Sequence, residues 1–485
     1  MTELLRRARE FEAERRLPDS ERPAYHLTPP VGWMNDPNGF SVYKGEYHLF
    51  FQYHPYSVDW GPMHWGHAKT KDFIHWEYLP AVMAPDKEYD KDGCFSGGAI
   101  ELPDGRHLLI YTGVSVHDGR MTQTQNLAIG DGIDYEKLPE NPIVKTSDIP
   151  EGGSVRDFRD PKLWRDPDGT YYIVVGNRAP DDSGQILLYR SSDAFQWEYV
   201  GVVDSCRNEY GKMWECPDFF PLDGKQVLMA SPMEMPPIGL EFHPGYSTLS
   251  LIGDYRRETN EFRREFAQAT DYGLDFYASQ TLLIPDGRRI MVAWMQNWAT
   301  ARCKPIGKRY FGSMTIPREL QIRDGRLIQN PVRELEQIRG EKVEYRDELI
   351  SGETVLPGIR GRVLDLTIRV RPADADGYRW FQLNFAQNEN YVTYVRYLPG
   401  ESKIRIDRAR CDFSYDVIHS REFLTRERNG ELKLRVLLDR DSAELFVNDG
   451  EQAASLLIYA PQEADGISFA SDGRVLMDAE KYGLL

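Results

Sequence analysis

Five short turns recur along this 485-residue chain at nearly even intervals. Each turn places a glycine after a polar residue and is followed by a run rich in β-branched and aromatic residues, which is the pattern of a hairpin turn leading into a strand. Successive turn glycines are 60, 64, 55 and 63 residues apart. Five antiparallel units of this length predict a five-bladed β-propeller. The glycines are Gly45, Gly105, Gly169, Gly224 and Gly287.

Three acidic residues stand nine positions before three of these glycines: Asp36, Asp160 and Glu215. Ser96 and Ala278 occupy the same position in the other two units. Because the inner strands of propeller blades converge on the central axis, residues at one register should meet there. We therefore expect the three carboxylates to share one pocket. Acids brought together in this way can perform acid/base chemistry once their pKa values separate.

The chain is too long for one compact core, so two domains are expected. Residues 1–23 read as an N-terminal helical segment, residues 24–330 carry the five repeats, and residues 331–345 read as a polar linker helix. From 346 to 485, short alternating segments separated by Gly, Asp and Asn turns predict a β-sandwich. The predicted fold class is all-β, a five-bladed β-propeller followed by a C-terminal β-sandwich.

Composition limits the partners and the location that we expect. A net charge of −17 disfavours nucleic acid and anionic membrane as partners. No apolar run reaches the roughly 18 residues of a membrane span, and the charged N-terminus lacks the apolar stretch of a secretory signal. Five scattered cysteines without a CxxC pair favour reduced thiols. We expect a cytoplasmic protein that uses neither a metal nor an organic cofactor.

The sequence around each acid suggests a different role. Asp36 lies in Asn-Asp-Pro-Asn-Gly, where proline and glycine fix a tight turn after the carboxylate. Arg159 next to Asp160 should keep that carboxylate ionised, and the Trp and Cys that flank Glu215 should favour a protonated acid. An ionised Asp opposite a protonated Glu is the arrangement of retaining glycosidases, although these spacings alone leave other acid/base chemistry open.

Three motifs make the chain resemble a known family. WMNDPNG at 33–39, FRDP at 158–161 and WECPD at 214–218 occur in the order and at the separations typical of glycoside hydrolase family 32, the β-fructofuranosidases. The resemblance extends to SAELFVNDG at 442–450 and so covers nearly the whole chain. It implies a five-bladed propeller with a C-terminal sandwich, in agreement with the repeat. One departure is His54, where the family more often has Asn.

The resemblance also implies roles for individual residues. Asp36 would be the nucleophile, Glu215 the acid/base and Asp160 the transition-state stabiliser. The fructosyl group would be bound by further residues close to the first three turns of the repeat. These are Asn35, Asn38, Gln52, Trp60, Phe95, Ser96 and Arg159.

The sequence therefore predicts a retaining β-fructofuranosidase that hydrolyses the terminal β-D-fructofuranosyl bond of sucrose, sucrose 6-phosphate or short fructo-oligosaccharides. The alternatives are a non-catalytic fructan- or sucrose-binding protein on the same scaffold, and an inverting five-bladed-propeller pentosidase. The expected partner is a small-molecule sugar, and the sandwich could provide a homodimer surface. A basic cluster is a candidate phosphate site on the leaving-group side. It consists of Arg302, Lys304, Lys308 and Arg309.

Overall fold

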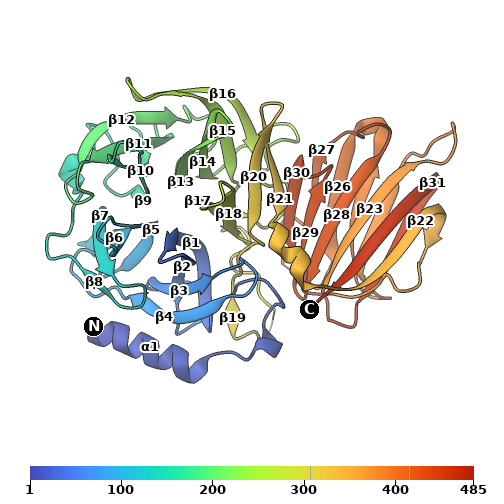
Figure 1. Ribbon diagram of the computed structural model, residues 1–485, viewed down its shortest axis with the longest axis horizontal. Coiled ribbons are helices and arrows are strands. Elements are labelled where there is room, and N and C mark those ends of the chain that lie inside the picture. The colour runs from blue at the N-terminus through green and yellow to red at the C-terminus, as the bar shows by residue number, and fades with distance from the viewer. Residues whose placement is uncertain (306, 414) are drawn as a thin grey trace.

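The computed structural model describes residues 1–305, 307–413 and 415–485. Figure 1 shows a ring of sheets followed by a separate stack of long strands at the C-terminal end. In these residues five sheets form the ring, and in each the first strand lies nearest the centre. This arrangement confirms the five-bladed propeller that the turn spacing predicts.

The blades are formed almost entirely from consecutive antiparallel strands. The first contains β1 (Gly32–Tyr43), β2 (Glu46–His54), β3 (His64–Thr70), β4 (Glu77–Met83) and the distant β19 (Tyr310–Phe311). The second contains β5 (Gly93–Glu101), β6 (His107–His117), β7 (Arg120–Gly130) and β8 (Tyr135–Lys137). The third contains β9 (Phe158–Arg165), β10 (Tyr171–Arg178), β11 (Gly184–Ser191) and β12 (Glu198–Ser205). The fourth contains β13 (Met213–Leu222), β14 (Lys225–Met233), β15 (Leu249–Arg256) and β16 (Glu261–Ala269). The fifth contains β17 (Tyr277–Leu283), β18 (Arg289–Trp294), β20 (Arg318–Arg323) and β21 (Arg326–Pro331).

Strand β19 closes the ring. It follows β18 in sequence but pairs in parallel with β1, placing Tyr310 opposite Gly32 and Phe311 opposite Trp33. Backbone hydrogen bonds therefore join the last blade to the first, and they do so directly beside the Trp33–Asn35 stretch of the predicted site.

The N-terminal segment covers the outside of the first blade. Helix α1 (Glu3–Arg15) buries Leu5 and Ala8, and the Glu12 carboxylate accepts a hydrogen bond of 2.8 Å from the backbone N–H of Ala81 on β4. A short 3₁₀ helix, η1 (Asp19–Glu21), follows, and two others, η2 (Thr146–Asp148) and η4 (Pro399–Glu401), lie in loops. In the described part of the chain, no helix combines the length and apolarity needed to cross a membrane.

The expected linker helix over 331–345 is wrong in its second half. The helix η3 (Arg333–Ile338) is a short 3₁₀ segment, and strand β22 (Arg339–Thr354) begins directly after it. Residues 339–354 pair along the length of the last strand of the chain, and Val343 and Tyr345, two residues apart, pack against the sandwich core. Pairing with a strand more than a hundred residues away outweighs the local helical preference. We propose that the domain boundary lies in η3.

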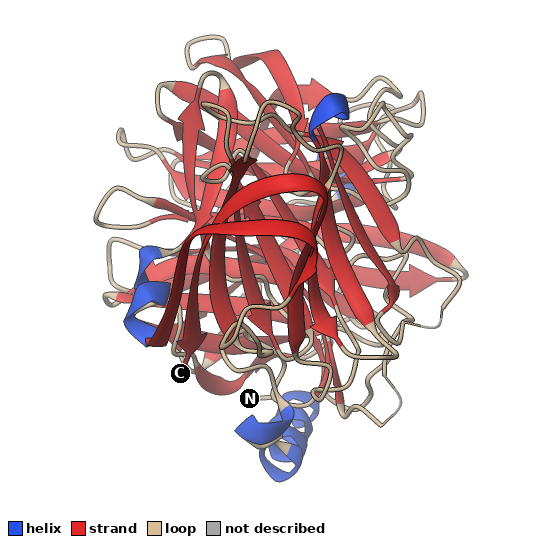
Figure 2. Cartoon of the chain, turned by 90° about the vertical axis from the view of Figure 1, so that its right-hand side faces the viewer, coloured by secondary structure: helices blue, strands red, loops and turns tan. Residues whose placement is uncertain are grey.

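The C-terminal strands form a sandwich, as predicted. One layer contains β24 (Phe381–Gln387), β25 (Val392–Leu398), β26 (Lys403–Arg410) and β27 (Ser420–Leu424). The other contains β23 (Leu364–Pro372), β28 (Leu432–Asp439), β29 (Ser442–Val447) and β30 (Gln452–Leu457). The long strand β31 (Gly466–Leu484) pairs with β24 through its first residues and with β23 through its last, so it belongs to both layers. Figure 2 shows these long strands facing the viewer.

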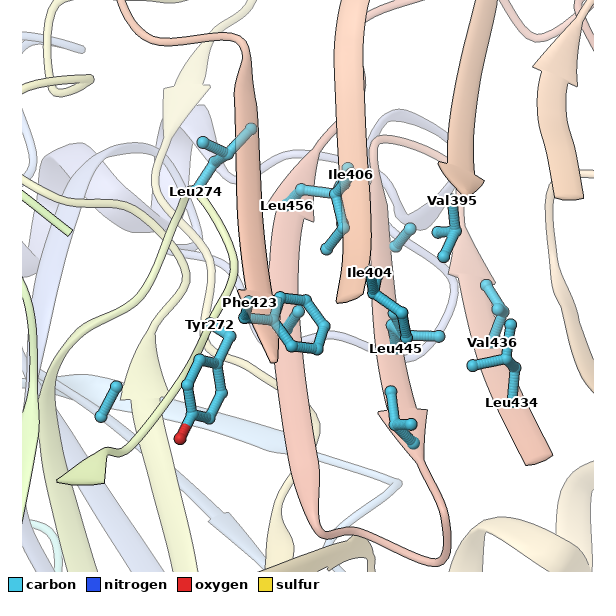
Figure 3. Packing of buried hydrophobic residues seen from close by; sticks show 14 of the residues in the cluster. Tyr272, Leu274, Val395, Ile404, Ile406, Phe423, Leu434, Val436, Leu445 and Leu456 are labelled. Carbon is cyan, nitrogen blue, oxygen red and sulfur yellow. The ribbon is translucent and has the colours of Figure 1, made fainter. Parts of the chain in front are cut away.

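The sandwich core continues into the propeller. Val395, Ile404 and Phe423 of one layer face Val436 and Leu445 of the other, all of them buried (Figure 3). Tyr272 and Leu274, in the loop before β17, belong to the same cluster, and the rings of Tyr272 and Phe423 lie 5.2 Å apart. The shared apolar core fixes the sandwich against the fourth and fifth blades.

Buried ion pairs cross the same boundary. The His26 ring binds Asp439 at 2.8 Å through Nδ1 and Glu444 at 2.9 Å through Nε2. Arg318 on β20 binds the same Glu444 at 2.5 Å and Asp271 at 2.9 Å. These side chains are almost completely buried. The charges of His26 and Arg318 therefore depend on Asp439 and Glu444 of the sandwich, whereas the Arg318–Asp271 pair lies within the propeller.

Candidate active site

A β-bulge occurs at the same register in the innermost strand of every blade. The pairing between the first two strands shifts next to Met34, Phe95, Arg159, Glu215 and Tyr277. A bulge re-aims a side chain and ends regular pairing, which explains how five strands turn one residue each toward the axis. A proline follows this register in three of the blades, and proline cannot donate to the ladder hydrogen bonds that a bulge leaves out.

The bulges require unusual backbone conformations. Asp160, Cys216 and Ala278 adopt φ values of 65°, 48° and 56°, in the left-handed region that residues with a Cβ rarely enter. Such conformations persist only where the surroundings hold them, and they concentrate at functional sites.

Asp36 is buried on β1 and accepts three hydrogen bonds. Asn35 Nδ2 donates to Oδ1 at 2.9 Å, while Ser96 Oγ donates to Oδ2 at 2.7 Å. The thiol of Cys216 donates to Oδ2 at 3.4 Å. Asn35 is itself held by Trp33, whose Nε1 donates to Asn35 Oδ1 at 2.7 Å. The carboxylate is therefore fixed by groups from three blades.

Cys216 links the three acids. Its backbone N–H donates to Asp160 Oδ2 at 2.9 Å, and its thiol lies 3.6 Å from the same oxygen. Because Cys216 directly follows Glu215, the residue that joins Asp36 to Asp160 also belongs to the strand that carries the third acid. On the other side, the Asp160 N–H donates to Thr112 Oγ1 at 2.9 Å.

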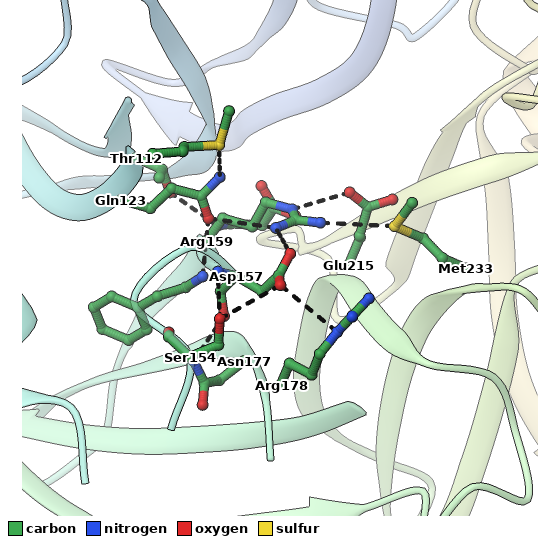
Figure 4. Close-up of polar contacts among 12 residues, drawn as sticks. Thr112, Gln123, Ser154, Asp157, Arg159, Asn177, Arg178, Glu215 and Met233 are labelled. Carbon is green, nitrogen blue, oxygen red and sulfur yellow. Dashed lines mark hydrogen bonds and ion pairs between the residues drawn. The ribbon is translucent and has the colours of Figure 1, made fainter. Parts of the chain in front are cut away.

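Glu215 is held by an arginine and a tyrosine. Arg159 Nε donates to Oε1 at 3.0 Å, and the Tyr277 hydroxyl donates to Oε2 at 2.7 Å. Figure 4 shows the Arg159 guanidinium between Glu215 and Asp157, and its Nη1 donates to Asp157 Oδ1 at 3.0 Å. Gln123 accepts a further, longer bond from the same nitrogen at 3.3 Å. Both oxygens of Glu215 are thus oriented by fixed donors.

Two expectations about the surroundings of the acids need correction. Burial raises the pKa of Asp160 to about 7 against the opposing charge of Arg159, so the expectation that Arg159 keeps this carboxylate ionised is not confirmed. The hydrogen bonds of the guanidinium go to Glu215 and Asp157. The Trp214 side chain does not surround the Glu215 carboxyl group. Neighbouring residues on a strand face opposite ways, and Trp214 is buried in a hydrophobic cluster with its Nε1 donating to the Tyr210 carbonyl at 2.9 Å.

Burial dominates the electrostatics of the cluster. It raises the pKa of Asp36, and the nearby charge of Glu215 adds to this effect. Burial also raises the pKa of Asp160, to about 7, with Glu215 and Asp36 adding to it and Arg159 opposing it. Burial and the surrounding carboxylates raise the pKa of the Cys216 thiol, which stays protonated and able to donate. Burial and the neighbouring carboxylates therefore disfavour the ionised forms of Asp36 and Asp160.

The structure brings most of the predicted sugar-binding residues to the same end of the axis. The fully buried Asn38 lies between Gln52 and Ser96. In the amide orientation that gives both of its atoms a partner, its oxygen accepts from Gln52 Nε2 at 3.0 Å and its nitrogen donates to Ser96 Oγ at 3.2 Å. Phe95 is half-buried and contacts the edge of Trp60 with ring centroids 6.2 Å apart. Trp60 differs from the others because 49% of it is exposed.

Tyr277 is a functional candidate that the sequence did not indicate, and Cys216, expected only to make the surroundings of Glu215 less polar, also hydrogen-bonds Asp36 and Asp160. Each is adjacent to a register position, Tyr277 before Ala278 and Cys216 after Glu215, so a search one residue to either side of the register would have found both. Asp157 and Gln123, which hold Arg159, carry no such signal because neither is adjacent to the register position of a blade.

The basic cluster is largely neutralised. Lys304 pairs with Asp59, Lys308 with Asp441, and Arg309 with Glu21. The fourth member, Arg302, is exposed and has no ion pair within the described residues. Three of the four candidate phosphate ligands therefore already have a carboxylate partner.

Comparison with known proteins gives a consistent result over the full chain. The model of the glycosyl hydrolases family 32 N-terminal domain matches residues 26–331, and that of the family 32 C-terminal domain matches residues 334–481. The chain is 38% identical to raffinose invertase of Escherichia coli over 94% of this chain and 93% of the relative. It is also 38% identical to sucrose-6-phosphate hydrolase of Escherichia coli, over 93% and 92% of the two chains.

Solved structures agree. The Bombyx mori GH32 β-fructofuranosidase, solved as a mutant in complex with sucrose, is 33% identical and superposes with a TM-score of 0.83 over 99% of this chain and 97% of that one. The sucrose-6-phosphate hydrolase of Lactobacillus gasseri is 26% identical and superposes with a TM-score of 0.84 over 99% and 97%.

Proposed function

Because the chain belongs to glycosyl hydrolase family 32, we propose that its three clustered acids cleave the terminal β-D-fructofuranosyl bond of sucrose with retention of configuration. The observation that carries this proposal is the joining of Asp36, Asp160 and Glu215, from three blades, through the single residue Cys216. Similarity to enzymes named for raffinose, sucrose and sucrose 6-phosphate supports a β-fructoside as the substrate class.

In the first step, Asp36 attacks the anomeric carbon of the fructosyl group while Glu215 gives its proton to the glycosidic oxygen. The three donors on Asp36 hold its carboxylate in one orientation, which lowers the entropic cost of attack. The products are a fructosyl–enzyme ester and a free glucose unit. In the second step, the Glu215 carboxylate takes a proton from water, whose oxygen displaces Asp36 and releases fructose.

Asp160 and the Glu215 supports have different tasks. Asp160 faces the same point as Asp36 and would bind fructosyl hydroxyls, whose hydrogen bonds strengthen as positive charge develops at the anomeric carbon. Arg159 and Tyr277 keep Glu215 in place while it changes from acid to base. Tyr277 suits both states, because its hydroxyl lies 2.7 Å from Glu215 Oε2 and 2.9 Å from the Ser231 carbonyl. It can donate to an ionised Glu215 or, when Glu215 is protonated, accept from it while donating to Ser231.

The Asp36→Ala variant tests the proposal. We expect kcat on sucrose to fall by roughly four orders of magnitude with the Tm little changed. In the wild type, proton NMR of the first-formed fructose should show the β-anomer. Initial release of α-fructose would refute retention. Full activity of the variant would show that Asp36 is not the nucleophile.

Free sucrose, without a phosphate requirement, is the substrate that best fits the paired state of the basic cluster at the rim of the site. Lys304, Lys308 and Arg309 are each paired with a carboxylate, so a phosphate would have to displace those partners. We expect kcat/KM for sucrose to equal or exceed kcat/KM for sucrose 6-phosphate. Kestose and inulin are assayed in parallel as separate substrates. A tenfold or larger preference for the phosphate would show that Arg302 or a rearranged rim binds it.

A further inference from the structure

One loop connects the site to the sandwich. Residues 297–305, called here the rim loop, follow β18. Its Trp298 stacks on Trp33 with ring centroids 6.4 Å apart and contacts Trp294 edge-on at 5.1 Å. Trp33 in turn holds Asn35, the neighbour and hydrogen-bond donor of Asp36. The rim loop therefore packs against the group that supports the proposed nucleophile.

The sandwich holds the backbone of the rim loop with two tyrosines. The Tyr459 hydroxyl donates to the Cys303 carbonyl at 3.0 Å, and the Tyr415 hydroxyl donates to the Lys304 carbonyl at 2.9 Å. Both tyrosines lie in loops of the sandwich, and the rings of Tyr459 and Phe413 are stacked at 4.9 Å. Two consecutive carbonyls of a propeller loop are thus fixed by the other domain.

A buried ion pair anchors the start of the loop. Arg408 of β26 and Asp275 in the loop before β17 are completely buried and paired. Asp275 Oδ1 also accepts a hydrogen bond from Thr300 Oγ1 at 3.0 Å. Asn297, at the first position of the rim loop, donates through Nδ2 to the Leu274 carbonyl at 2.7 Å. The sandwich therefore holds the end of the loop directly, and it holds the first half indirectly, through the pairing of Arg408 with Asp275.

The far side of the rim loop reaches the most exposed part of the site. Lys304 pairs with Asp59, the residue before Trp60. The Asp59 carbonyl is held by the His54 ring, with Nδ1 at 2.9 Å. The rim loop therefore bridges the sandwich and the segment that carries Trp60.

The rim faces the leaving group rather than the fructosyl group. Asn35, Asn38, Gln52 and Ser96 are all buried within the first two strands of blades one and two, where strand pairing holds them without the sandwich. Trp60 is half-exposed, and Ala299 and Arg302 are exposed. Since the fructosyl group must reach the buried acids, the second sugar projects outward past the rim.

We propose that the C-terminal sandwich is a positioning element for leaving-group binding: Tyr415, Tyr459 and the Arg408–Asp275 pair hold the rim loop, which through Lys304 and Asp59 holds Trp60 against the second sugar. This inference rests on the proposed function, which places the fructosyl group at the acids and the second sugar beyond them. Without these bonds the contacts to the fructosyl group remain, but the rim becomes mobile and the leaving group loses its ordered wall.

The test is the double variant Tyr415→Phe/Tyr459→Phe, which keeps both rings and removes only the two hydroxyls. The matched control is Tyr345→Phe, because the Tyr345 hydroxyl also donates to a backbone carbonyl, that of Pro357 at 2.8 Å, but within the sandwich. Two ordinary hydrogen bonds of average strength correspond to about 30-fold. We expect KM for sucrose to rise about tenfold in the double variant, with kcat and the inhibition constant of free fructose changed less than about threefold.

Hydrogen–deuterium exchange supplies a readout that needs no substrate. Amides of the rim loop should exchange faster in the double variant and unchanged in the control, at equal Tm. Unchanged exchange in the rim loop, or an equal rise in KM in the control, overturns the proposal. A loss of kcat without a rise in KM also overturns it, because it would place the effect on the acids. Should the double variant not fold, Tyr459→Phe alone retains the stack on Phe413 and tests the same direction.

Failure of the proposed function is distinguishable from failure of this inference. A wild-type protein that releases no fructose from any β-fructoside refutes the function, whereas the exchange of the rim loop still decides whether the sandwich holds it.

Discussion

The buried His26 should make stability depend on pH at the boundary between the two domains. Burial lowers the pKa of this ring, but the hydrogen bonds and charges of Asp439 and Glu444 outweigh burial and raise it to about 9. An unfolded His has a pKa of about 6.5. Because the folded pKa is the higher one, protonated His26 stabilises the fold fully below about pH 6.5, and this contribution is lost as pH rises through about 9.

The size of the effect follows from the shift. A difference of about 2.5 pKa units corresponds to about 3 kcal/mol of unfolding free energy at low pH. For a chain of 485 residues, an unfolding entropy of roughly 2 cal/mol/K per residue converts this into a Tm change of about 3 °C. In the His26→Gln variant this pH-dependent part is absent.

Calorimetry between about pH 6 and about pH 10 can measure it. The Tm difference between wild type and His26→Gln should be largest at the acidic end and smaller by about 3 °C at the alkaline end, because only the wild type loses its proton. His75→Gln is the control, since His75 is exposed and paired only with Asp72 in its own turn. A wild-type-minus-variant difference that stays constant across this range would show that His26 is not protonated between its two carboxylates, and the reasoning would fail.

Three further variants address Glu215 and its supports. Glu215→Ala should nearly abolish hydrolysis of sucrose but retain far more activity on a fructoside whose leaving group departs without protonation. Azide should restore turnover of this variant, with formation of fructosyl azide detectable by mass spectrometry. Equal losses on good and poor leaving groups would assign the acid role to another residue. Tyr277→Phe removes one donor to Glu215 and should lower kcat/KM by about 10- to 100-fold, the range of a hydrogen bond to a charged group. Asp157→Asn should lower kcat/KM less, because Arg159 retains Glu215 as a partner, and a larger loss than for Tyr277→Phe would show that Asp157 acts more directly.

The position of the three acids was readable from the sequence because two regular patterns combine. Side chains alternate every two positions along a strand and blades recur every sixty or so, so Asp36, Asp160 and Glu215 at one offset from their turns had to reach one place. The bulges that turn them inward were not visible, but the prolines after this register are their trace in the sequence.

The contacts of these acids could not be predicted in the same way. Arg159 adjoins Asp160 in sequence but binds Glu215, because neighbours on a strand point apart and the bulge redirects both. His26 and Asp439 lie 413 positions apart, and no local sequence pattern predicts their pairing. The prediction of a linker helix was wrong for the same reason, since strand β22 is stabilised by pairing with β31, which lies at the other end of the sandwich domain in sequence.

The strand that belongs to both sandwich layers has a consequence for the order in which the protein matures during synthesis. The blades are built from neighbouring strands and can assemble one after another as the chain emerges, apart from the short β19 that joins the last to the first. The sandwich cannot assemble strand by strand in this way, because β23 and β24 both pair with β31, which follows them by many residues in sequence. At a translation rate of about 5–20 residues per second, β31 is synthesised roughly 8 to 30 seconds after the propeller. A nascent chain can therefore form the ring of acids before β31 completes the sandwich that holds the rim loop.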